Sequence, residues 1–381
     1  MQIDKIIDKK LGFGFMRLPL LSSDPADIDF HSVNKMVDTY LSSGFKYFET
    51  ALPYHDQMSE TAIKRCLVER YQRDQFILAD KMPFNIRDKE WFDIIFNKQL
   101  KQCGVDYFDF YLLHNLGKDV FHKYEKMGGI DYLYKLKETG KAKHIGFSFH
   151  DTPEVLDEIL SAHPEMDFVQ LQINYLDMDS PHIQSRACYQ VARKHHKPII
   201  VMEPVKGGSL VNIPDEALLL FKALNNDAST ASFAIRFAAS LEGVVLVLSG
   251  MSTLTQVEDN VSYMKRFKPL NSKEHDTIQK VTAVIKQSHN IQCTACRYCI
   301  DECKNNIPIP DLFSIYNSIT SSGQNDRTTE SRHKILYERA VYTKGKAGDC
   351  VKCGTCEKAC PQHLPIVKRL ETIANLFEDQ Q

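Results

Sequence analysis

Residues 33–51 read VNKMVDTYLSSGFKYFETA and contain one complete helix-to-strand unit. Apolar side chains recur at helical spacing from Val33 to Leu41, and Gly44 marks the end of the predicted helix. A strand is then predicted over residues 46–50, where aromatic residues and threonine are concentrated. The strand finishes next to Glu49, so an ionisable group is expected at its carboxyl end.

The same kind of unit recurs over the first 265 residues. Eight strands are predicted in alternation with helices, over residues 12–18, 46–50, 75–81, 107–114, 144–148, 168–172, 199–203 and 244–249. This alternation is typical of a parallel α/β architecture, and eight units in about 250 residues indicate a (β/α)8 TIM barrel. A doubly wound open sheet is the alternative, but it needs a glycine-rich first turn, for which Gly12-Phe13-Gly14 is too short a match.

A chain of 381 residues is long enough for a large domain and a small one. We expect the barrel over residues 1–270, a connecting helix over 271–289 and a mainly helical ferredoxin-like domain over 290–381. Within this last domain, helices are predicted over residues 309–316 and 333–342, separated by a polar loop at 321–326.

Eight of the eleven cysteines form two identical runs, C-x2-C-x2-C-x3-C. They are Cys293, Cys296, Cys299 and Cys303, followed by Cys350, Cys353, Cys356 and Cys360. This spacing predicts two [4Fe-4S] clusters, because it gathers three thiolates around one face of an iron-sulfur cube. In two-cluster ferredoxins the fourth cysteine binds the other cluster, so Cys360 would complete the first site and Cys303 the second.

Disulfides and structural zinc are the alternatives for these runs, although zinc sites use paired cysteines rather than runs of four. The other three cysteines, Cys66, Cys103 and Cys188, lie in apolar helical patterns and are predicted to be small core residues.

Charge and hydropathy exclude several classes of partner. The 47 basic and 49 acidic residues leave a formal charge of −2, so no overall field favours nucleic acid or an acidic membrane. The N-terminal residues lack a signal-peptide pattern, and no stretch approaches the 18 apolar residues of a membrane span. We expect a cytoplasmic protein without nucleic-acid or membrane partners, in a compartment where reduced thiols can take up clusters.

Ionisable residues stand at or just beyond the ends of the second, third and fourth predicted strands. They are Glu49, Tyr54, Lys81 and His114. Barrel enzymes place catalytic groups at these ends, and this set suits proton delivery to a carbonyl oxygen while hydride reaches its carbon. A lysine cation would lower the pKa of the tyrosine, the glutamate would hold that lysine, and the histidine would polarise the carbonyl.

In these residues and their order the chain resembles the aldo/keto reductases over about residues 8–265. The resemblance rests on Gly12-Phe13-Gly14 with Met16-Arg17, Glu49-Thr50-Ala51 with Tyr54, Lys81, His114 and Gly146-Phe147-Ser148. It implies NAD(P)H-dependent carbonyl reduction in a (β/α)8 barrel, with Tyr54 as proton donor, Lys81 as modifier of its pKa and His114 orienting the substrate. Glu49 replaces an aspartate of the family, so either its ion pair with the lysine shifts or the longer carboxylate folds back.

The resemblance also implies where a nicotinamide nucleotide binds. Ser148 and Gln170 match residues that hold the carboxamide, and Met202 stands where the family stacks a tyrosine on the ring. Lys206 with Gly207 would meet the pyrophosphate, unless this segment is only a strand-to-helix turn. The remaining predicted cofactor contacts are Met16, Gly250, Ser252, Gln256 and Asn260. Because Gly250 and Gln256 replace a Lys and an Arg that read the 2'-phosphate in many members, NADH is at least as suitable as NADPH.

These observations predict an iron-sulfur oxidoreductase that reduces a small carbonyl or oxidises an alcohol. Hydride moves two electrons and a cluster carries one, so a flavin such as FMN is a further candidate cofactor, and a ferredoxin-like protein is a candidate electron partner. Two alternatives stay open. The clusters could be structural or sensory in a self-sufficient reductase, or the barrel could be a non-catalytic electron-transfer or regulatory subunit.

Overall fold

The computed structural model describes residues 3–22, 24–181, 183–287, 291–322 and 327–378. The chain divides into two compact units, of which the first comprises residues 1–205 and 228–276 and the second residues 206–227 and 277–381. Residues 206–227 therefore group with the C-terminal cysteine segment, although they follow a barrel strand in the sequence.

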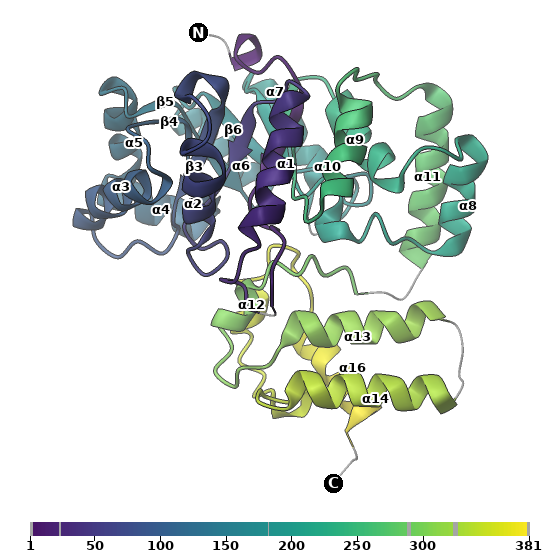
Figure 1. Ribbon diagram of the computed structural model, residues 1–381. Helices are drawn as coiled ribbons and strands as arrows, with labels where there is room; N and C mark the ends of the chain where they lie inside the picture. The colour runs from purple at the N-terminus through teal and green to yellow at the C-terminus, as the bar shows by residue number, and fades with distance from the viewer. Residues whose placement is uncertain (1–2, 23, 182, 288–290, 323–326, 379–381) are drawn as a thin grey trace. The chain divides into compact units, whose positions relative to one another are not determined.

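The first unit is a closed barrel of eight parallel strands, in which each strand pairs with the next and the last pairs with the first (Figure 1). The strands are β1 (Leu11–Gly14), β2 (Tyr47–Glu49), β3 (Ile77–Met82), β4 (Phe108–Leu116), β5 (Ala142–Phe149), β6 (Phe168–Gln172), β7 (Ile199–Met202) and β8 (Val244–Ser249). The predicted (β/α)8 architecture is confirmed.

Helices connect the parallel strands and cover the outside of the barrel. They are α1 (Phe30–Ser42), α2 (Ser59–Ile63), α3 (Glu90–Cys103), α4 (Lys118–Met127), α5 (Gly129–Glu138), α6 (Pro153–Ala162), α7 (Ser185–Lys194), α9 (Thr230–Ser240) and α10 (Leu254–Met264). Shorter turns are η1 (Ile3–Lys5), η2 (Lys64–Val68) and η3 (Arg73–Gln75). The apolar face of α1 that its periodicity predicts, Val33, Met36, Val37 and Tyr40, is buried.

Large apolar side chains fill the barrel where its strands begin. The rings of Tyr47 and Phe110 meet edge to face with centroids 5.3 Å apart, and Phe110 meets Phe168 in the same way at 5.2 Å. Gly146 has no room for a side chain, since an added Cβ would lie 2.5 Å from the carbonyl oxygen of Phe168. This packing keeps one end of the barrel apolar and leaves the polar side chains to the carboxyl ends of the strands.

The first strand is shorter than predicted. It was expected over residues 12–18, but β1 ends at Gly14. Phe15 N still donates to Glu49 O at 2.8 Å, and the chain then turns, so that Leu18 N donates to a side chain, His55 Nε2, at 3.0 Å. The residues between them are thereby released from the sheet at its carboxyl end.

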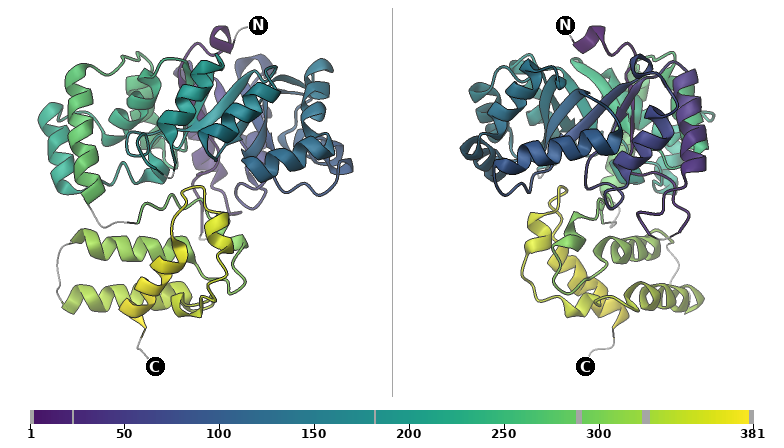
Figure 2. Two further views of the ribbon diagram at one scale, coloured as in Figure 1. Left: turned by 180° about the vertical axis from the view of Figure 1, so that it is seen from behind. Right: turned by 60° about the vertical axis from the view of Figure 1, so that its left-hand side comes forward.

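The second unit is mainly helical. It contains η4 (Lys206–Gly208), α8 (Asp215–Leu224), most of α11 (Ser272–Gln287), α12 (Tyr298–Asp301), α13 (Ile309–Ser322), α14 (Arg327–Val341), η5 (Ala347–Asp349), α15 (Thr355–Lys358) and α16 (Ile366–Phe377). Helices α13 and α14 lie side by side in Figure 1 and Figure 2. Their shared core includes Leu312, Phe313 and Tyr337, together with Leu370 and Ile373 from α16.

The two helices predicted in the cysteine segment lie within α13 and α14. Residues 323–326 of the predicted polar loop, and residues 288 and 289 of the predicted connecting helix, lie outside the described residues. Within the described part of the chain, no helix is both long enough and apolar enough to cross a membrane.

Candidate active site and cluster-binding segment

Three strand ends bring the predicted catalytic residues together inside the first unit. Glu49 is the last residue of β2, Lys81 lies near the end of β3, and Tyr54 follows β2 in a turn. Lys81 Nζ is 2.5 Å from Glu49 Oε1 and donates to Tyr54 OH at 2.9 Å. Only 1% of Lys81 is exposed, so the ammonium is compensated by a buried carboxylate rather than by water.

Glu49 contacts a second partner from across the barrel. Its Oε1 accepts from Lys81, while its Oε2 accepts a hydrogen bond from Gln170 Nε2 of β6 at 2.5 Å. The longer glutamate therefore neither folds back nor loses the lysine. Its extra methylene lets one carboxylate connect β3 and β6.

The protonation of Tyr54 differs from the prediction. Burial raises the pKa of its hydroxyl well above the usual value, and the carboxylates of Glu49, Glu203 and Asp80 raise it further. The expectation that Lys81 lowers this pKa was wrong for this structure, because desolvation of the phenolate and the nearby negative charges outweigh the ammonium. Tyr54 therefore holds its proton throughout the physiological range.

His114 completes the set at the end of β4. Its ring meets that of Tyr54 edge to face at 6.0 Å, and the ring of Phe84 lies 6.3 Å away. Burial lowers the pKa of His114 well below its usual value, and the positive charge of Lys81 lowers it further. The imidazole is therefore neutral, as the prediction of an electrophilic rather than a cationic group requires.

The cysteines of the second unit separate into two groups that follow the ferredoxin crossover. Burial raises the pKa of Cys299, and the neighbouring Cys296, Cys293, Cys360 and Cys356 raise it further. Burial raises the pKa of Cys356 to about 11, with added effects of Cys350, Cys303 and Cys353 among its neighbours.

Cys360 thus lies near the first run and Cys303 near the second, which is the arrangement that two cubane clusters sharing ligands in this way need. Thiolate sulfur is also the ligand type that iron-sulfur clusters take. Among the described residues, no three His, Cys, Asp or Glu side chains converge tightly enough to hold a single metal ion.

Comparison with known proteins identifies both parts of the chain. The sequence profile of the aldo/keto reductase family matches residues 10–283, well over half of the protein. The chain belongs to the aldo/keto reductase family. A profile described as a 4Fe-4S dicluster domain matches residues 292–365, which contain all eight cysteines of the two runs. The protein is therefore an oxidoreductase of this family with a 4Fe-4S domain at its C-terminal end.

Individual aldo/keto reductases are related only distantly. One from Mycolicibacterium vanbaalenii is 23% identical over 246 residues, which are 64% of this chain and 82% of that protein. The holo structure of AKR11C1 from Bacillus halodurans has a TM-score of 0.58 at 23% identity, covering 73% of this chain and 94% of that one. An aldo-keto reductase from Klebsiella pneumoniae in complex with NADPH has a TM-score of 0.57 at 16% identity, covering 72% and 90%. These likenesses show the barrel fold.

Two residues that the family resemblance assigns to the nicotinamide carboxamide already have protein partners. Gln170 is bonded to Glu49, as described above, and Ser148 Oγ accepts from Asn115 N at 2.8 Å. Asn115 has a φ of 56°, so the serine stabilises a left-handed turn at the end of β4. Met16 and Met202 are half-buried at the ends of β1 and β7. The nucleotide contacts of these residues stay predictions.

The end of β8 leads into the N-terminus of α10. Thr253 caps this helix, its side chain accepting from Gln256 N at 3.2 Å, and Gln256 Oε1 accepts from Ser252 N at 2.7 Å. Asn260 is buried and donates to Ser249 Oγ at 2.8 Å. Gln256 and Asn260 therefore fix the turn after β8, and any contact with a nucleotide is additional to this role.

One cation near this turn was missed as a site residue by the sequence analysis. A Cβ added to Gly250 would lie 3.2 Å from Cδ of Arg17, so the arginine stem runs beside the position where family members carry a lysine. The guanidinium pairs with Glu203 at 3.9 Å. The resemblance quoted Arg17 within its first motif, but only the fold brings β1 beside β8.

Lys206 and Gly207 belong to the second unit, with the cysteines. Lys206 is 2% exposed and its Nζ donates to Gln362 Oε1 at 2.7 Å, two residues after Cys360. Gly207 has a φ of 64°, and an added Cβ would lie 2.5 Å from the carbonyl oxygen of Thr294. Contact of this segment with a pyrophosphate stays a prediction, since the lysine is already bonded within its own unit.

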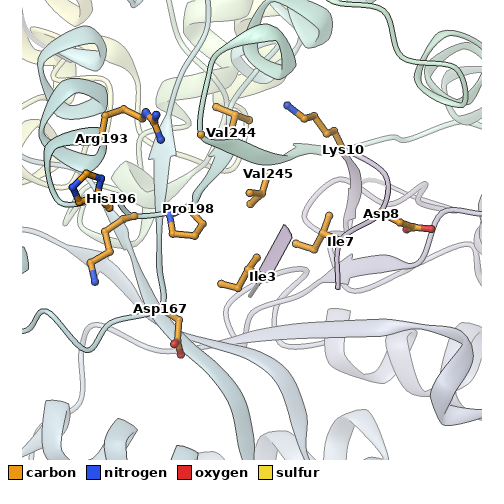
Figure 3. A pocket seen from close by; sticks show the side chains of 12 residues that line it. Ile3, Ile7, Asp8, Lys10, Asp167, Arg193, His196, Pro198, Val244 and Val245 are labelled. Carbon is orange, nitrogen blue, oxygen red and sulfur yellow. The ribbon is translucent and has the colours of Figure 1, made fainter. Parts of the chain in front are cut away.

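A pocket of about 790 Å³ lies where the barrel strands begin (Figure 3). Three of its cations have protein partners: Lys10 donates to Ala239 O at 3.0 Å, Lys197 donates to Met166 O at 2.7 Å, and Arg193 pairs with Glu242. None of the catalytic set lines this pocket. We assign it no part in the reaction, because the reactive side chains lie at the strand carboxyl ends.

Proposed function

We propose that this aldo/keto reductase reduces the carbonyl group of a small substrate with hydride from a bound nicotinamide. The observation that carries the proposal is the 2.9 Å hydrogen bond from Lys81 Nζ to Tyr54 OH. An ammonium can only donate hydrogen bonds, so the phenol oxygen accepts and its own hydrogen must point elsewhere. That hydrogen is available to a carbonyl oxygen in the adjacent site.

The protonation states favour reduction over alcohol oxidation. Tyr54 keeps its proton because burial raises its pKa, and His114 is neutral because burial lowers its pKa. A neutral donor and a neutral electrophile can both hydrogen-bond a developing alkoxide, whereas alcohol oxidation would require a tyrosinate. The nicotinamide supplies the hydride when bound, and the protein supplies the proton and the orientation.

NADH is the nucleotide we favour, although a relative of known structure binds NADPH. The positions that carry two cations in many family members are Gly250 and Gln256 here, which leaves Arg17 as the basic group argued above. One arginine paired with Glu203 offers less compensation to a phosphate dianion than two free cations would. Flavin such as FMN is the second candidate, because it would connect hydride transfer to one-electron carriers.

We further propose that the C-terminal segment holds two [4Fe-4S] clusters that exchange electrons with a ferredoxin-like partner in the cytoplasm. The grouping of Cys360 with the first run and Cys303 with the second supports this ligand assignment. When bound, the clusters would carry single electrons. The alternative is that they only stabilise or regulate a self-sufficient reductase.

The test uses the full chain, purified anaerobically with its clusters, and a panel of aldehydes and ketones with NADH or NADPH. Tyr54→Phe should lower kcat by about 100-fold or more, because the proton donor is lost, while the Kd of the nucleotide stays unchanged. Tyr71→Phe is the matched control, since that hydroxyl binds Asp38 at the outside of the barrel. Turnover of Tyr54→Phe equal to that of the native enzyme would refute the proton-donor role, and extraction of bound flavin would favour the second candidate.

A further inference from the structure

The residue before Lys81 takes no part in the mechanism described above, yet it is fully buried. Successive side chains of a strand point to opposite faces, so Lys81 points into the barrel while Asp80 points out toward the helices. There it meets Glu60 from α2 and Gln99 from α3. All three of these polar side chains have an exposure of 0%.

Gln99 connects the two carboxyl groups to the main chain of Lys81. Its Nε2 lies 3.1 Å from Glu60 Oε1, 3.1 Å from Asp80 Oδ1 and 2.9 Å from Lys81 O. Its Oε1 accepts from Tyr111 OH at 2.5 Å, which fixes the orientation of the amide. Lys81 N donates to Asp80 Oδ1 at 2.7 Å. Both backbone polar groups of the lysine are thus bonded to this cluster.

Two carboxyl groups this close, without water, cannot both be ionised, because like charges in a buried site repel strongly. The positive charges near them are few: Lys81, which is paired with Glu49, and Lys98, which acts on Glu60. Cys103 Sγ donates to Asp80 Oδ2 at 3.7 Å, and Glu60 Oε2 has no partner among the described residues. Burial raises the pKa of Glu60 to about 7 and that of Asp80 well above its usual value.

We propose that Glu60 and Asp80 are joined by a shared proton and act, through Gln99, as positioning residues that fix the main chain of Lys81. They place its ammonium between Glu49 and Tyr54 from behind the strand, without contacting substrate or nucleotide. The kinetic part of this inference rests on the carbonyl reduction proposed above. The shared proton itself does not.

An amide can replace a protonated carboxyl group but cannot replace an ionised one. Asp80→Asn should therefore keep the hydrogen bonds to Glu60 and to Lys81 N, and retain kcat within about threefold. Asp80→Ala removes them and should lower kcat about tenfold or more, with the nucleotide Kd unchanged, because a small displacement of the lysine misplaces the proton donor. If Asp80 acted as a negative charge, both variants would lose the same activity, and the inference would fail.

Infrared spectroscopy of the holoenzyme tests the proton without turnover. The native protein at pH 8 should show the C=O stretch of a buried protonated carboxyl group, and a second such band should appear as the pH falls through about 7. The double variant Glu60→Gln with Asp80→Asn should lack both bands. Asp109→Asn is the matched control and should keep them, since Asp109 is also buried on a barrel strand but is paired with Arg73 and Lys143.

A native spectrum without these bands overturns the inference even if the enzyme reduces carbonyls. Bands that are present and vanish in the double variant support it, even if no carbonyl substrate is found. Failure of the shared proton and failure of the proposed function are therefore distinguishable.

Discussion

Gln170 donates a hydrogen bond to Glu49 across the barrel, at 2.5 Å, so the carboxylate that binds the catalytic lysine is itself held from β6. The two residues are 121 positions apart in the chain. An aspartate at position 49 would be shorter by one methylene, and it could not keep both Lys81 and Gln170 at hydrogen-bonding distance without a shift of the strands. Glu49 therefore fits this chain's own barrel, although the family has aspartate at this position.

Glu49→Asp is thus expected to impair the enzyme. The carboxylate retracts by about 1.5 Å, loses one of its two partners and leaves Lys81 less well placed beside Tyr54, so kcat should fall about tenfold. Gln170→Leu should have a similar effect, because it removes the second partner directly. Steady-state kinetics with the best carbonyl substrate measures both. An aspartate variant as active as the native enzyme would show that the contact to Gln170 is dispensable.

Glu60 should make the stability of the barrel depend on pH. Its pKa of about 7 in the folded state lies above the ordinary value of 4.5, so the folded protein keeps a proton that the unfolded chain releases. Stability should therefore fall as the pH rises from about 4.5 to 7, by on the order of 3 kcal/mol, and Glu60→Gln should abolish this fall.

Urea unfolding followed by the fluorescence of the single tryptophan, Trp91 in α3, measures this effect at pH 5 and pH 8. Glu69→Gln is the control, because that carboxylate is exposed and only pairs with Lys64 at 4.0 Å. The same pH dependence in Glu60→Gln as in the native protein would contradict the assignment.

Cys353→Ser should remove one cluster and leave the other. Iron should drop from about eight to about four atoms per chain, and the electron paramagnetic resonance of the reduced protein should lose one of its two signals. Cys66→Ser should keep both clusters, since Cys66 is buried in the barrel unit and its thiol donates to Phe30 O at 3.8 Å. Equal iron in the two variants would contradict the ligand assignment. Full turnover of Cys353→Ser with a nicotinamide would favour a structural or sensory role for the clusters.

Gln256→Arg should shift the nucleotide preference toward NADPH. A guanidinium at the N-terminus of α10 would add one charge-assisted bond to a 2'-phosphate, and the ratio of the Kd values for NADPH and NADH should fall about threefold to tenfold. Gln256→Leu separates this effect from the loss of the bond to Ser252 N, and should leave the ratio unchanged. Fluorescence titration with each nucleotide gives both ratios. A ratio that moves equally in the two variants would mean that the turn, and not the charge, selects the nucleotide.

The sequence predicted the eight strands and the catalytic set because both depend on local patterns. Residues 46–50 alternate with a helix whose apolar face is visible in the sequence, and strand ends in a parallel barrel converge whatever their separation in the chain. The end of β1 was misjudged because Phe15 to Leu18 are mostly apolar, while the turn that releases them depends on His55, far away in the sequence.

The remaining parts of the site depend on contacts that no local pattern contains. The pKa of Tyr54 was predicted from Lys81 alone, but it depends on how completely the fold excludes water from the phenol. The bond between Gln99 and Asp80 joins a helix to the outer face of a strand, where a polar residue would ordinarily be assigned to the surface. Likewise, residues 206–227 group with the cysteine segment through packing that their sequence does not announce.

The pairing of β1 with β8 also bears on how this protein survives oxygen. Iron-sulfur clusters are destroyed by oxidation, and a unit that loses them loses part of what holds it folded. The barrel, however, has no first or last strand with unpaired backbone groups, so damage elsewhere in the chain exposes no sheet edge on which strands of other molecules could assemble. An air-damaged molecule should therefore lose its iron without seeding aggregation from its barrel.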